Sequence, residues 1–490
     1  MDAKRCSTLR DQEKGNEDRL SVLQDSILLL ILSLLPTRDA IKTSTLSRRW
    51  DRLWTSVSTL KFHLPSEQKT PKNFITSVHR TLLLHESQRI SKFSIRFYYK
   101  EKFASDVDAW IRFATRKSVK VLHLDFTDRC TYTVGEDVPY AMPRHFFNNE
   151  TFTELKLNFC SFKMHGVQLS WKSLRKLSLR QIVLSDDMVN GILAGCPILE
   201  CLVLEQCSSL TFLSIPSAKL KSLTLCNMQN EIKIYASHLL SLTLSGYMHE
   251  AEHSIVDLSS LEYAKIDFNL MFFDVVDECE VEYFCRKLRN IIRNVCHAKT
   301  LALCQSCVQL LTACEVYSIQ IPILKCKSLT LETSFGEHEL IGITSLLQNS
   351  PGLENLIIIA SNLYGFWCES DLTRKHPVDE QRFWDSQTDA FSSSLHHLRT
   401  VRLYSFMSWG VGSGCDIMDM SLGELQKKIA RELNLVKFLL TNFTVIERVD
   451  FHIKKDQNSK ITKLGEIIHT VSQAILVCPK ASSLVEVVYW

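Results

Sequence analysis

One histidine and four cysteines are the residues whose types and spacing come nearest to a metal site: Cys296, His297, Cys304, Cys307 and Cys314. Cys304 and Cys307 form a C-x-x-C pair, and thiolate and imidazole groups at such spacing bind structural zinc. A second pair at matching spacing is missing, and Leu301 and Leu303 beside the pair occupy strand positions. Cysteine is also a common small apolar residue of protein cores. We therefore expect buried thiols here rather than a metal site.

Two further patterns would indicate phosphate binding or catalysis if they were complete. Gly410, Gly412 and Gly414 lie in the string G-V-G-S-G, but no Lys-Ser or Lys-Thr pair follows at the offset that a phosphate-binding loop needs. A catalytic cysteine needs a nearby base and an orienting group, and no sequence signature of such an enzyme occurs. The sequence thus predicts a protein without catalytic residues or a cofactor.

A stretch near the N-terminus indicates binding instead. From Ile27 to Leu35 every residue is apolar except Ser33, so a helix built from it has no face for solvent. A bilayer is excluded, because a membrane-spanning helix needs about 20 apolar residues. Such a helix is either sunk in a large core or shared between its own domain and a partner protein.

The residues that follow predict two more short helices. Pro36 ends the first helix, Thr37 is the expected N-cap of the second, and Ser47 is the expected N-cap of the third. Trp50 and Trp54 would share one face of this third helix, since they are four residues apart. Three helices of roughly forty residues make too small a core to be stable alone. Support from outside this segment is therefore expected.

The string from Asp18 to Trp54, D-R-L-S-V-L-Q-D-S-I-L-L-L-I-L-S-L-L-P-T-R-D-A-I-K-T-S-T-L-S-R-R-W-D-R-L-W, resembles an F-box of the plant F-box/leucine-rich-repeat kind. The resemblance implies docking on a Skp-family adaptor and, through it, on a cullin-based ubiquitin ligase. Carried over by position, the docking residues are Leu20, Leu23, Ile27, Ile31, Leu32, Leu35, Pro36, Leu46, Ser47 and Trp50. The family usually has Leu-Pro before the first helix, where this chain has Leu23 and Gln24. Losing the fixed φ of proline costs about 0.5 to 1 kcal/mol, which predicts weaker docking.

Composition places the rest of the chain among globular proteins. Its 490 residues are 45% hydrophobic, and 57 Lys and Arg against 54 Asp and Glu form no block of like charge, which disfavours nucleic-acid binding. The 17 cysteines, with no secretory segment before them, indicate reduced thiols in a nuclear or cytosolic protein. Residues 1–17 are charged and lack apolar periodicity, so we expect a disordered tail.

After two strand and helix alternations over residues 60–126, a short phrase recurs, with apolar residues at its first, fourth and sixth positions. It begins at Phe152, Leu174, Leu199, Leu220, Leu239, Leu261, Cys326, Leu353, Leu398 and Ile446. From Leu157 to Ile266 the last positions are 22, 25, 21, 19 and 22 residues apart. This spacing is typical of leucine-rich repeats, in which stacked parallel strands bury leucines that no single repeat could cover. We expect Cys160 and Cys207, three residues after the phrase, to bond the turn backbone.

Several stretches interrupt the repeats. Residues 268–301 carry apolar residues at helical spacing, including Val281, Phe284 and Leu288. The insertion at 361–397 is either a binding loop or a loop without a ligand, and the insertion at 404–423 is expected to be a surface loop. The amphipathic helix expected over 422–440 should pack on the last repeat.

Two further stretches, Val107 to Ala114 and Leu193 to Cys207, resemble the same plant family. Residues 435–453 together with 478–483 resemble the FBD region that ends many of these proteins. The resemblance implies no molecular role for that region.

These observations predict an α/β protein with a disordered tail at 1–17 and a three-helix F-box at 18–63. A leucine-rich-repeat solenoid follows at 64–394, with a curved parallel sheet and outer helices or loops, and an FBD-like region at 395–490 continues it. The resemblance implies a non-catalytic substrate-recognition subunit of a Skp-cullin-F-box ubiquitin ligase that binds an unidentified target protein, with neither nucleic acid nor membrane as partner. Two other functions remain open: a ligand-dependent sensor, and a Skp-bound scaffold that joins no cullin.

Overall fold

The structure is a computed structural model that describes residues 20, 22–65, 71–127, 138–163, 168–228, 230–248, 253–270, 278–335, 337–360, 383, 395–404, 433–452, 473, 477, 479, 481 and 485–489. The chain forms two compact units. The first comprises residues 1–182 and 194–196, and the second comprises residues 183–193 and 197–490. The predicted tail at 1–17 lies outside the described residues.

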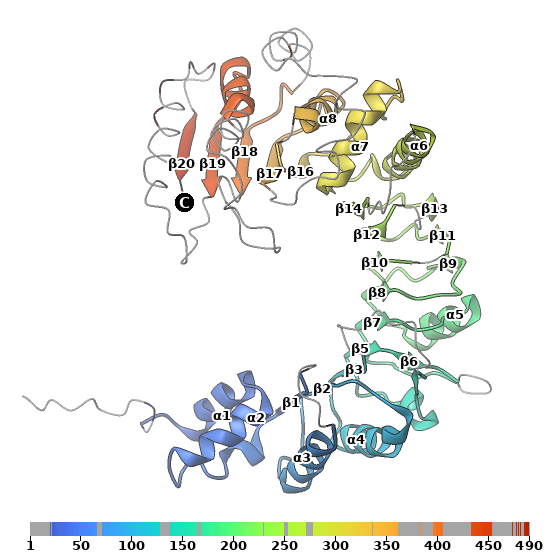
Figure 1. The fold of residues 1–490 in the computed structure, drawn as a ribbon, viewed down its shortest axis with the longest axis vertical. Helices are drawn as coiled ribbons and strands as arrows, with labels where there is room; N and C mark the ends of the chain where they lie inside the picture. The colour runs from blue at the N-terminus through green and yellow to red at the C-terminus, as the bar shows by residue number, and fades with distance from the viewer. Residues whose placement is uncertain are drawn as a thin grey trace, which may run out of the picture. The chain divides into compact units, whose positions relative to one another are not determined.

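The first unit begins with short helical elements and continues as a parallel sheet (Figure 1). Its N-terminal elements are α1 (Asp25–Leu34), α2 (Thr37–Lys42), η1 (Thr43–Thr45) and η2 (Leu53–Ser56). Its strands pair in the order β1 (Thr59–His63), β2 (Lys92–Arg96), β3 (Val121–Asp125), β5 (Glu154–Asn158) and β7 (Lys176–Arg180). The connections contain α3 (Pro71–Leu84), η3 (Glu101–Phe103), α4 (Ala104–Arg116), η4 (Arg144–Asn148) and the short pair β4 (Tyr140–Ala141) and β6 (Cys160–Ser161). The sheet therefore starts at Thr59, within the range predicted for the F-box.

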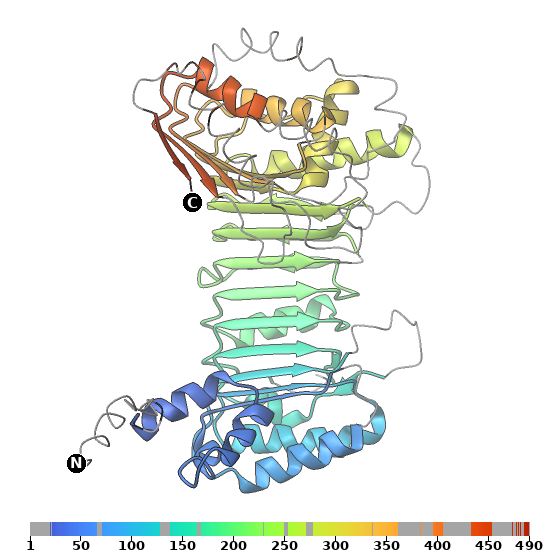
Figure 2. The same cartoon turned by 60° about the vertical axis from the view of Figure 1, so that its left-hand side comes forward.

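The second unit contains ten strands of a parallel sheet among the described residues (Figure 2). In order, these strands are β8 (Cys201–Glu205), β10 (Ser222–Cys226), β12 (Ser241–Tyr247), β14 (Tyr263–Asn269), β15 (Thr300–Leu303), β16 (Ser328–Thr333), β17 (Asn355–Ala360), β18 (Thr400–Tyr404), β19 (Arg448–His452) and β20 (Glu486–Tyr489). A small parallel sheet has the order β13 (His253–Asp257), β11 (Ile232–Tyr235) and β9 (Phe212–Ser214). Its helices include α6 (Glu278–Val295), α7 (Gln305–Val316) and α8 (Glu337–Gln348), while α5 (Asp186–Gly195) contains residues of both units.

Rows of leucines hold each sheet together. Leu202, Leu223, Leu242 and Ala264 are register partners on neighbouring strands, and each is at most 1% exposed. Burial alternates along the strands, so every second side chain points into the core. All ten predicted phrases lie at parallel strands, which confirms the leucine-rich-repeat prediction.

At the ends of several strands, a residue with left-handed backbone conformation continues the backbone hydrogen bonding between neighbouring repeats. Phe159, Gln181, Gln206 and Asn227, two residues after the last leucine of their phrases, have φ of 58°, 50°, 52° and 49°. The backbone N–H of Gln206 donates to the carbonyl of Cys226 at 2.8 Å, and that of Asn227 donates to the carbonyl of Ser245 at 2.9 Å. These bonds repeat one turn geometry along the stack.

The two predicted turn cysteines follow such residues. The thiols of Cys160 and Cys207 donate to the carbonyls of Asn158 and Glu205, each at 3.6 Å. Their expected bonding to the turn backbone is confirmed.

The prediction of a third N-terminal α-helix is wrong. Residues 46–52 form turns, and the four-residue 3-10 helix η2 follows. Trp50 and Trp54 are nevertheless both buried. A helix in a protein is stabilised mainly by packing of an apolar face, and between residues 46 and 52 Trp50 is the one buried side chain. Thr37 is the first residue of α2 rather than its cap.

The C-terminal predictions are tested only in part. The predicted helix after residue 268 is confirmed as α6, in which Val281, Phe284 and Leu288 are buried. The insertion at 361–397 lies almost wholly outside the described residues, as do residues 405–423 and 424–432. Residues 433–442 are helical, and Val436 and Leu440 are 1% exposed. This part of the amphipathic helix packs into the chain's own core, as predicted.

Substitution of a leucine in one of the buried rows tests the predicted stacking of the strands. We expect Leu242→Asp to lower the free energy of unfolding by more than about 3 kcal/mol, because it buries a carboxylate without a partner. Thr243→Asp, next to it on the opposite, half-exposed side of β12, should change stability by less than about 1 kcal/mol. Chemical denaturation followed by circular dichroism measures both. Equal effects of the two substitutions would contradict the assignment of faces.

Candidate docking surface on the N-terminal helices

Helix α1 has one covered and one open apolar side. Leu28 and Leu32, four residues apart, are 0% and 1% exposed. Ile27, Leu30 and Leu34 recur at spacings of three and four and are 43%, 64% and 72% exposed. Residues at this spacing share one side of a helix. The helix therefore packs on its own unit along one side and leaves an apolar stripe uncovered along the other.

More apolar side chains are exposed in the segments before and after α1. Leu20 and Leu46 are 49% and 64% exposed, and Val22 is 81% exposed. Six of the 17 large hydrophobic residues exposed among the described residues thus fall between residues 20 and 46. Single exposed apolar residues are ordinary, but contiguous apolar patches mark interaction sites. We call Leu20, Val22, Ile27, Leu30, Ile31, Leu34 and Leu46 the apolar surface.

The residues predicted to dock on an adaptor fall into two groups. Eight of them are exposed or half-buried: Leu20, Leu23, Ile27, Ile31, Leu35, Pro36, Leu46 and Ser47. Leu32 and Trp50 are buried, at 1% and 6% exposure, so they support the helices from within and are not accessible to a partner. Sequence reasoning missed Val22, Leu30 and Leu34, although the helical spacing of Leu30 and Leu34 from Ile27 was visible. Contact with an adaptor stays a prediction for all of them.

An arginine fixes the start of α1. The Nε and Nη2 atoms of Arg49 donate to Asp25 Oδ1 at 2.9 and 2.6 Å, and Nη2 also donates to the carbonyl of Leu23. Asp25 lies in the first turn of α1, where a negative charge is also favoured by the helix dipole. The turn around Trp50 is thereby tied to the beginning of the helix.

Strand β1 fixes the end of α1. Lys61 Nζ donates to the carbonyls of Ser33 and Leu34 at 3.2 and 3.1 Å, where a helix leaves its last carbonyls unsatisfied. The backbone N–H of the same Lys61 donates to the buried hydroxyl of Thr37 at 2.7 Å. One strand residue thus holds α1 and α2 together on the sheet.

The segment after η2 is tied to the end of α3. The backbone N–H of Glu86 donates to the carbonyl of Thr55 at 2.9 Å, and that of Ser91 donates to Ser58 at 2.7 Å. His85 Nε2 donates to the carbonyl of Val57 at 2.9 Å. Burial lowers the pKa of His85, and the nearby charge of Lys117 lowers it further, against the opposing effect of the Val57 bond. A neutral imidazole therefore belongs to the folded state.

The cysteines and the histidine that were considered as zinc ligands do not form one cluster. Cys304 and Cys307 have sulfur atoms 3.5 Å apart, whereas the Cys314 thiol donates to the carbonyl of Cys285 at 3.8 Å. His297 Nε2 lies 2.7 Å from the carbonyl of Leu258. Within the described part of the chain, no three possible ligands are grouped as a metal site. In that part, no helix is both long and apolar enough to cross a membrane.

The stacked parallel strands and their buried leucines define a leucine-rich-repeat protein. The family described as At1g61320/AtMIF1, LRR domain, matches residues 82–422. F-box/LRR-repeat protein At3g03360 of Arabidopsis thaliana is 32% identical over 351 residues, which cover 70% of this chain and 70% of the relative. Putative F-box/LRR-repeat protein At5g02930 of the same plant is 31% identical over 413 residues, or 80% and 83% of the two chains. The chain belongs to this family of plant F-box/leucine-rich-repeat proteins. Its resemblance to an FBD region stays a prediction.

The position of Gln24 predicts a stabilising substitution. Gln24 has φ of −67°, which is the value that proline imposes, and none of the backbone hydrogen bonds of the described residues uses its N–H. We expect Gln24→Pro to raise the free energy of unfolding by about 0.4 to 1 kcal/mol, by restricting the unfolded chain. Gln24→Ala, which leaves φ unrestricted, should not. Thermal denaturation of both variants checks this, and a destabilised proline variant would contradict it.

The lowered pKa of His85 predicts a pH-dependent weakening of the connection to Val57. The imidazole binds a proton more readily in the unfolded chain than in the folded one. The contribution of His85 to the free energy of unfolding is therefore fully present above the unfolded pKa of about 6.5, and it is lost as pH falls below that value. We expect hydrogen exchange at residues 55–58 and 86–91 to speed up, relative to the rest of the first unit, between about pH 7 and pH 5.5. His85→Gln, which keeps an N–H donor but cannot titrate, should remove this difference. Unchanged pH dependence in the variant would show that another group is responsible.

Proposed function

We propose that this chain is the substrate-recognition subunit of a Skp-cullin-F-box ubiquitin ligase. The N-terminal helices bind a Skp-family adaptor, the adaptor joins the cullin, and the repeats hold a target protein for ubiquitination. The subunit catalyses nothing. It raises the effective concentration of the target beside the ubiquitin-carrying enzyme, in the nucleus or the cytoplasm.

The exposed stripe of Ile27, Leu30 and Leu34 carries the proposal. A helix that buries Leu28 and Leu32 inside its own unit while presenting three large apolar residues outward is suited to lie in a hydrophobic groove of a partner. The relatives At3g03360 and At5g02930 are named F-box/LRR-repeat proteins, and the resemblance of residues 18–54 to an F-box supports the adaptor as the proposed partner.

The attachment of these helices to β1 also supports the proposal. Lys61 bonds the end of α1 through its side chain and α2 through its backbone. A target held on the sheet of the first unit is therefore connected to the docked helices by a short, hydrogen-bonded path. Such a fixed connection is what a subunit that presents a target needs.

A charge on the apolar surface tests docking. We expect Leu34→Asp to weaken binding of a purified Skp-family protein at least about 100-fold, because docking would bury a carboxylate that has no partner. Leu34 is 72% exposed, so folding should be unaffected. Leu83→Asp is the matched control, since Leu83 is 85% exposed on α3 and should leave binding unchanged. Calorimetry measures affinity, and circular dichroism verifies folding.

Three results would contradict or replace the proposal. Unchanged adaptor affinity of a folded Leu34→Asp variant would refute docking through α1. Recovery of the adaptor without any cullin from cells expressing the unmodified chain would favour the scaffold function. If a target binds only after a small molecule is added back to dialysed protein, the sensor function is supported instead.

A further inference from the structure

One side of the first unit's sheet is strongly basic. Along β1, β2, β3, β5 and β7, buried apolar residues alternate with residues on the other side of the sheet, which we call the open face. Its ionisable residues are Lys61, His63, Lys92, Arg96, His123, Asp125, Glu154, Lys156, Lys176 and Arg180. Six lysines and arginines therefore stand against two carboxylates. The whole chain carries a net charge of only +3, so this face concentrates positive charge.

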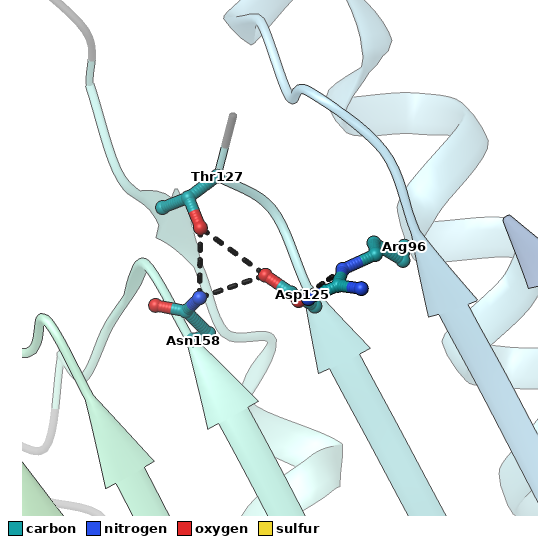
Figure 3. Close-up of polar contacts among 4 residues, drawn as sticks. All are labelled: Arg96, Asp125, Thr127 and Asn158. Carbon is teal, nitrogen blue, oxygen red and sulfur yellow. Dashed lines mark hydrogen bonds and ion pairs between the residues drawn. The ribbon is translucent and has the colours of Figure 1, made fainter. Parts of the chain in front are cut away.

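Both carboxylates of the open face are already engaged. Asp125 accepts hydrogen bonds from Arg96 Nε and Asn158 Nδ2, each at 2.7 Å (Figure 3). Glu154 Oε1 lies 2.9 Å from His123 Nε2 and 3.3 Å from Lys156 Nζ. These pairs leave positive charge that the face does not neutralise.

Lys92 and Lys176 contribute to this positive charge without a close ion pair to any described carboxylate. Among the described residues, no carboxylate oxygen lies within 4.0 Å of the ammonium group of Lys92 or of Lys176. Lys61 bonds two carbonyls, which accept its protons without cancelling its charge. In the described part of the chain, an anion at Lys92 or Lys176 would therefore displace no ion pair, although Glu154 lies nearby.

The cations of the open face repel one another. Partial burial lowers the pKa of Lys92, and after the opposing effect of Glu154 the charges of Lys61 and Lys156 lower it further. Burial lowers the pKa of His123 as well, and Lys92 and Lys156 add to this while Glu154 opposes it. Like charges held close together in this way are relieved when an opposite charge binds.

The register places two of the cations, Lys92 and Lys176, in one row across the strands. Lys92, Val121, Glu154 and Lys176 are successive partners on β2, β3, β5 and β7. Strands lie about 4.8 Å apart, so Lys92 and Lys176 start from backbone positions about 14 Å apart, and an extended peptide covers that distance with about four residues. Lys156, one row further along β5, lies between them.

We propose that the open face of the first unit binds an extended segment rich in Asp and Glu on the target protein. The inference rests on the proposed function in naming the class of target, while the binding itself requires no adaptor. Carboxylates of the segment pair with Lys92, Lys156 and Lys176.

Charge complementarity favours an acidic peptide over nucleic acid. Asp125 and Glu154 lie among the cations and would repel a continuous phosphate backbone. The described residues of the open face include no Phe, Tyr or Trp, which single-stranded nucleic acid uses for stacking. A peptide can place its acidic side chains beside the lysines and its small side chains beside the two carboxylates.

Fluorescence anisotropy with the full chain tests the proposal. The probe is a labelled peptide of alternating Glu and Ser, and the variant is Lys92→Gln with Lys156→Gln and Lys176→Gln. We expect about tenfold weaker binding by the variant, since each exposed ion pair contributes modestly. Raising the salt from about 0.05 to about 0.3 M should weaken binding by the unmodified chain, because screening shortens the reach of the charges.

A matched variant removes the same charge from the helical side of the unit. Lys72→Gln with Arg112→Gln and Arg116→Gln neutralises three exposed residues of α3 and α4 and should keep peptide affinity within about twofold. Equal losses in the two variants would overturn the proposal, because net charge alone would then explain binding. Tighter binding of single-stranded DNA than of the peptide, lost in the open-face variant, would overturn it in favour of nucleic acid. The assay contains no adaptor, so its outcome is independent of that of Leu34→Asp.

Discussion

The lateral stacking of strands is the constraint on which each unit depends. A strand of five residues buries two leucines on one side, and neither is covered unless the neighbouring strands bury theirs in the same register. Leu223, for example, lies between Leu202 and Leu242 in its row. The left-handed turns at Gln206 and Asn227 serve the same constraint, because they let the ladder of backbone hydrogen bonds continue after the strands end.

Where helices replace short loops, a buried polar contact supplements the leucines. Glu339, 1% exposed near the start of α8, accepts hydrogen bonds from Gln305 and Gln309 of α7 and from Thr333 and Ser334 at the end of β16. A buried carboxylate is tolerated because donors surround it. The contact fixes the two helices to each other and to the strand, which nondirectional apolar packing alone does less specifically.

The stacking leaves the other side of the sheet free to differ in chemistry. In the first unit that side collects lysines and arginines, whereas in the second unit β10 and β12 present Ser222, Thr224, Ser241 and Thr243 between their buried leucines. Because the leucines on the inner side provide the apolar packing of the strands, the intervening residues are not needed for that packing. The same division applies to α1, in which Leu28 and Leu32 secure the helix while Leu30 and Leu34 stay exposed.

The sequence alone determined what depends on local periodicity. Alternation at Leu242 and Leu244 predicted a strand, and helical spacing at Phe284 and Leu288 predicted α6, because each pattern lies within one element. The resemblance to a plant family followed from strings of adjacent residues.

The tertiary structure decided what depends on residues far apart in the chain. Since α1 is apolar all round, periodicity could not tell that Leu28 faces inward and Leu34 outward. The turn around Trp50 is linked through Arg49 to Asp25, 24 residues earlier, a contact that no local pattern indicates. The basic face depends on the register of strands that lie tens of residues apart in sequence, and register between parallel strands is set by packing rather than by any local pattern.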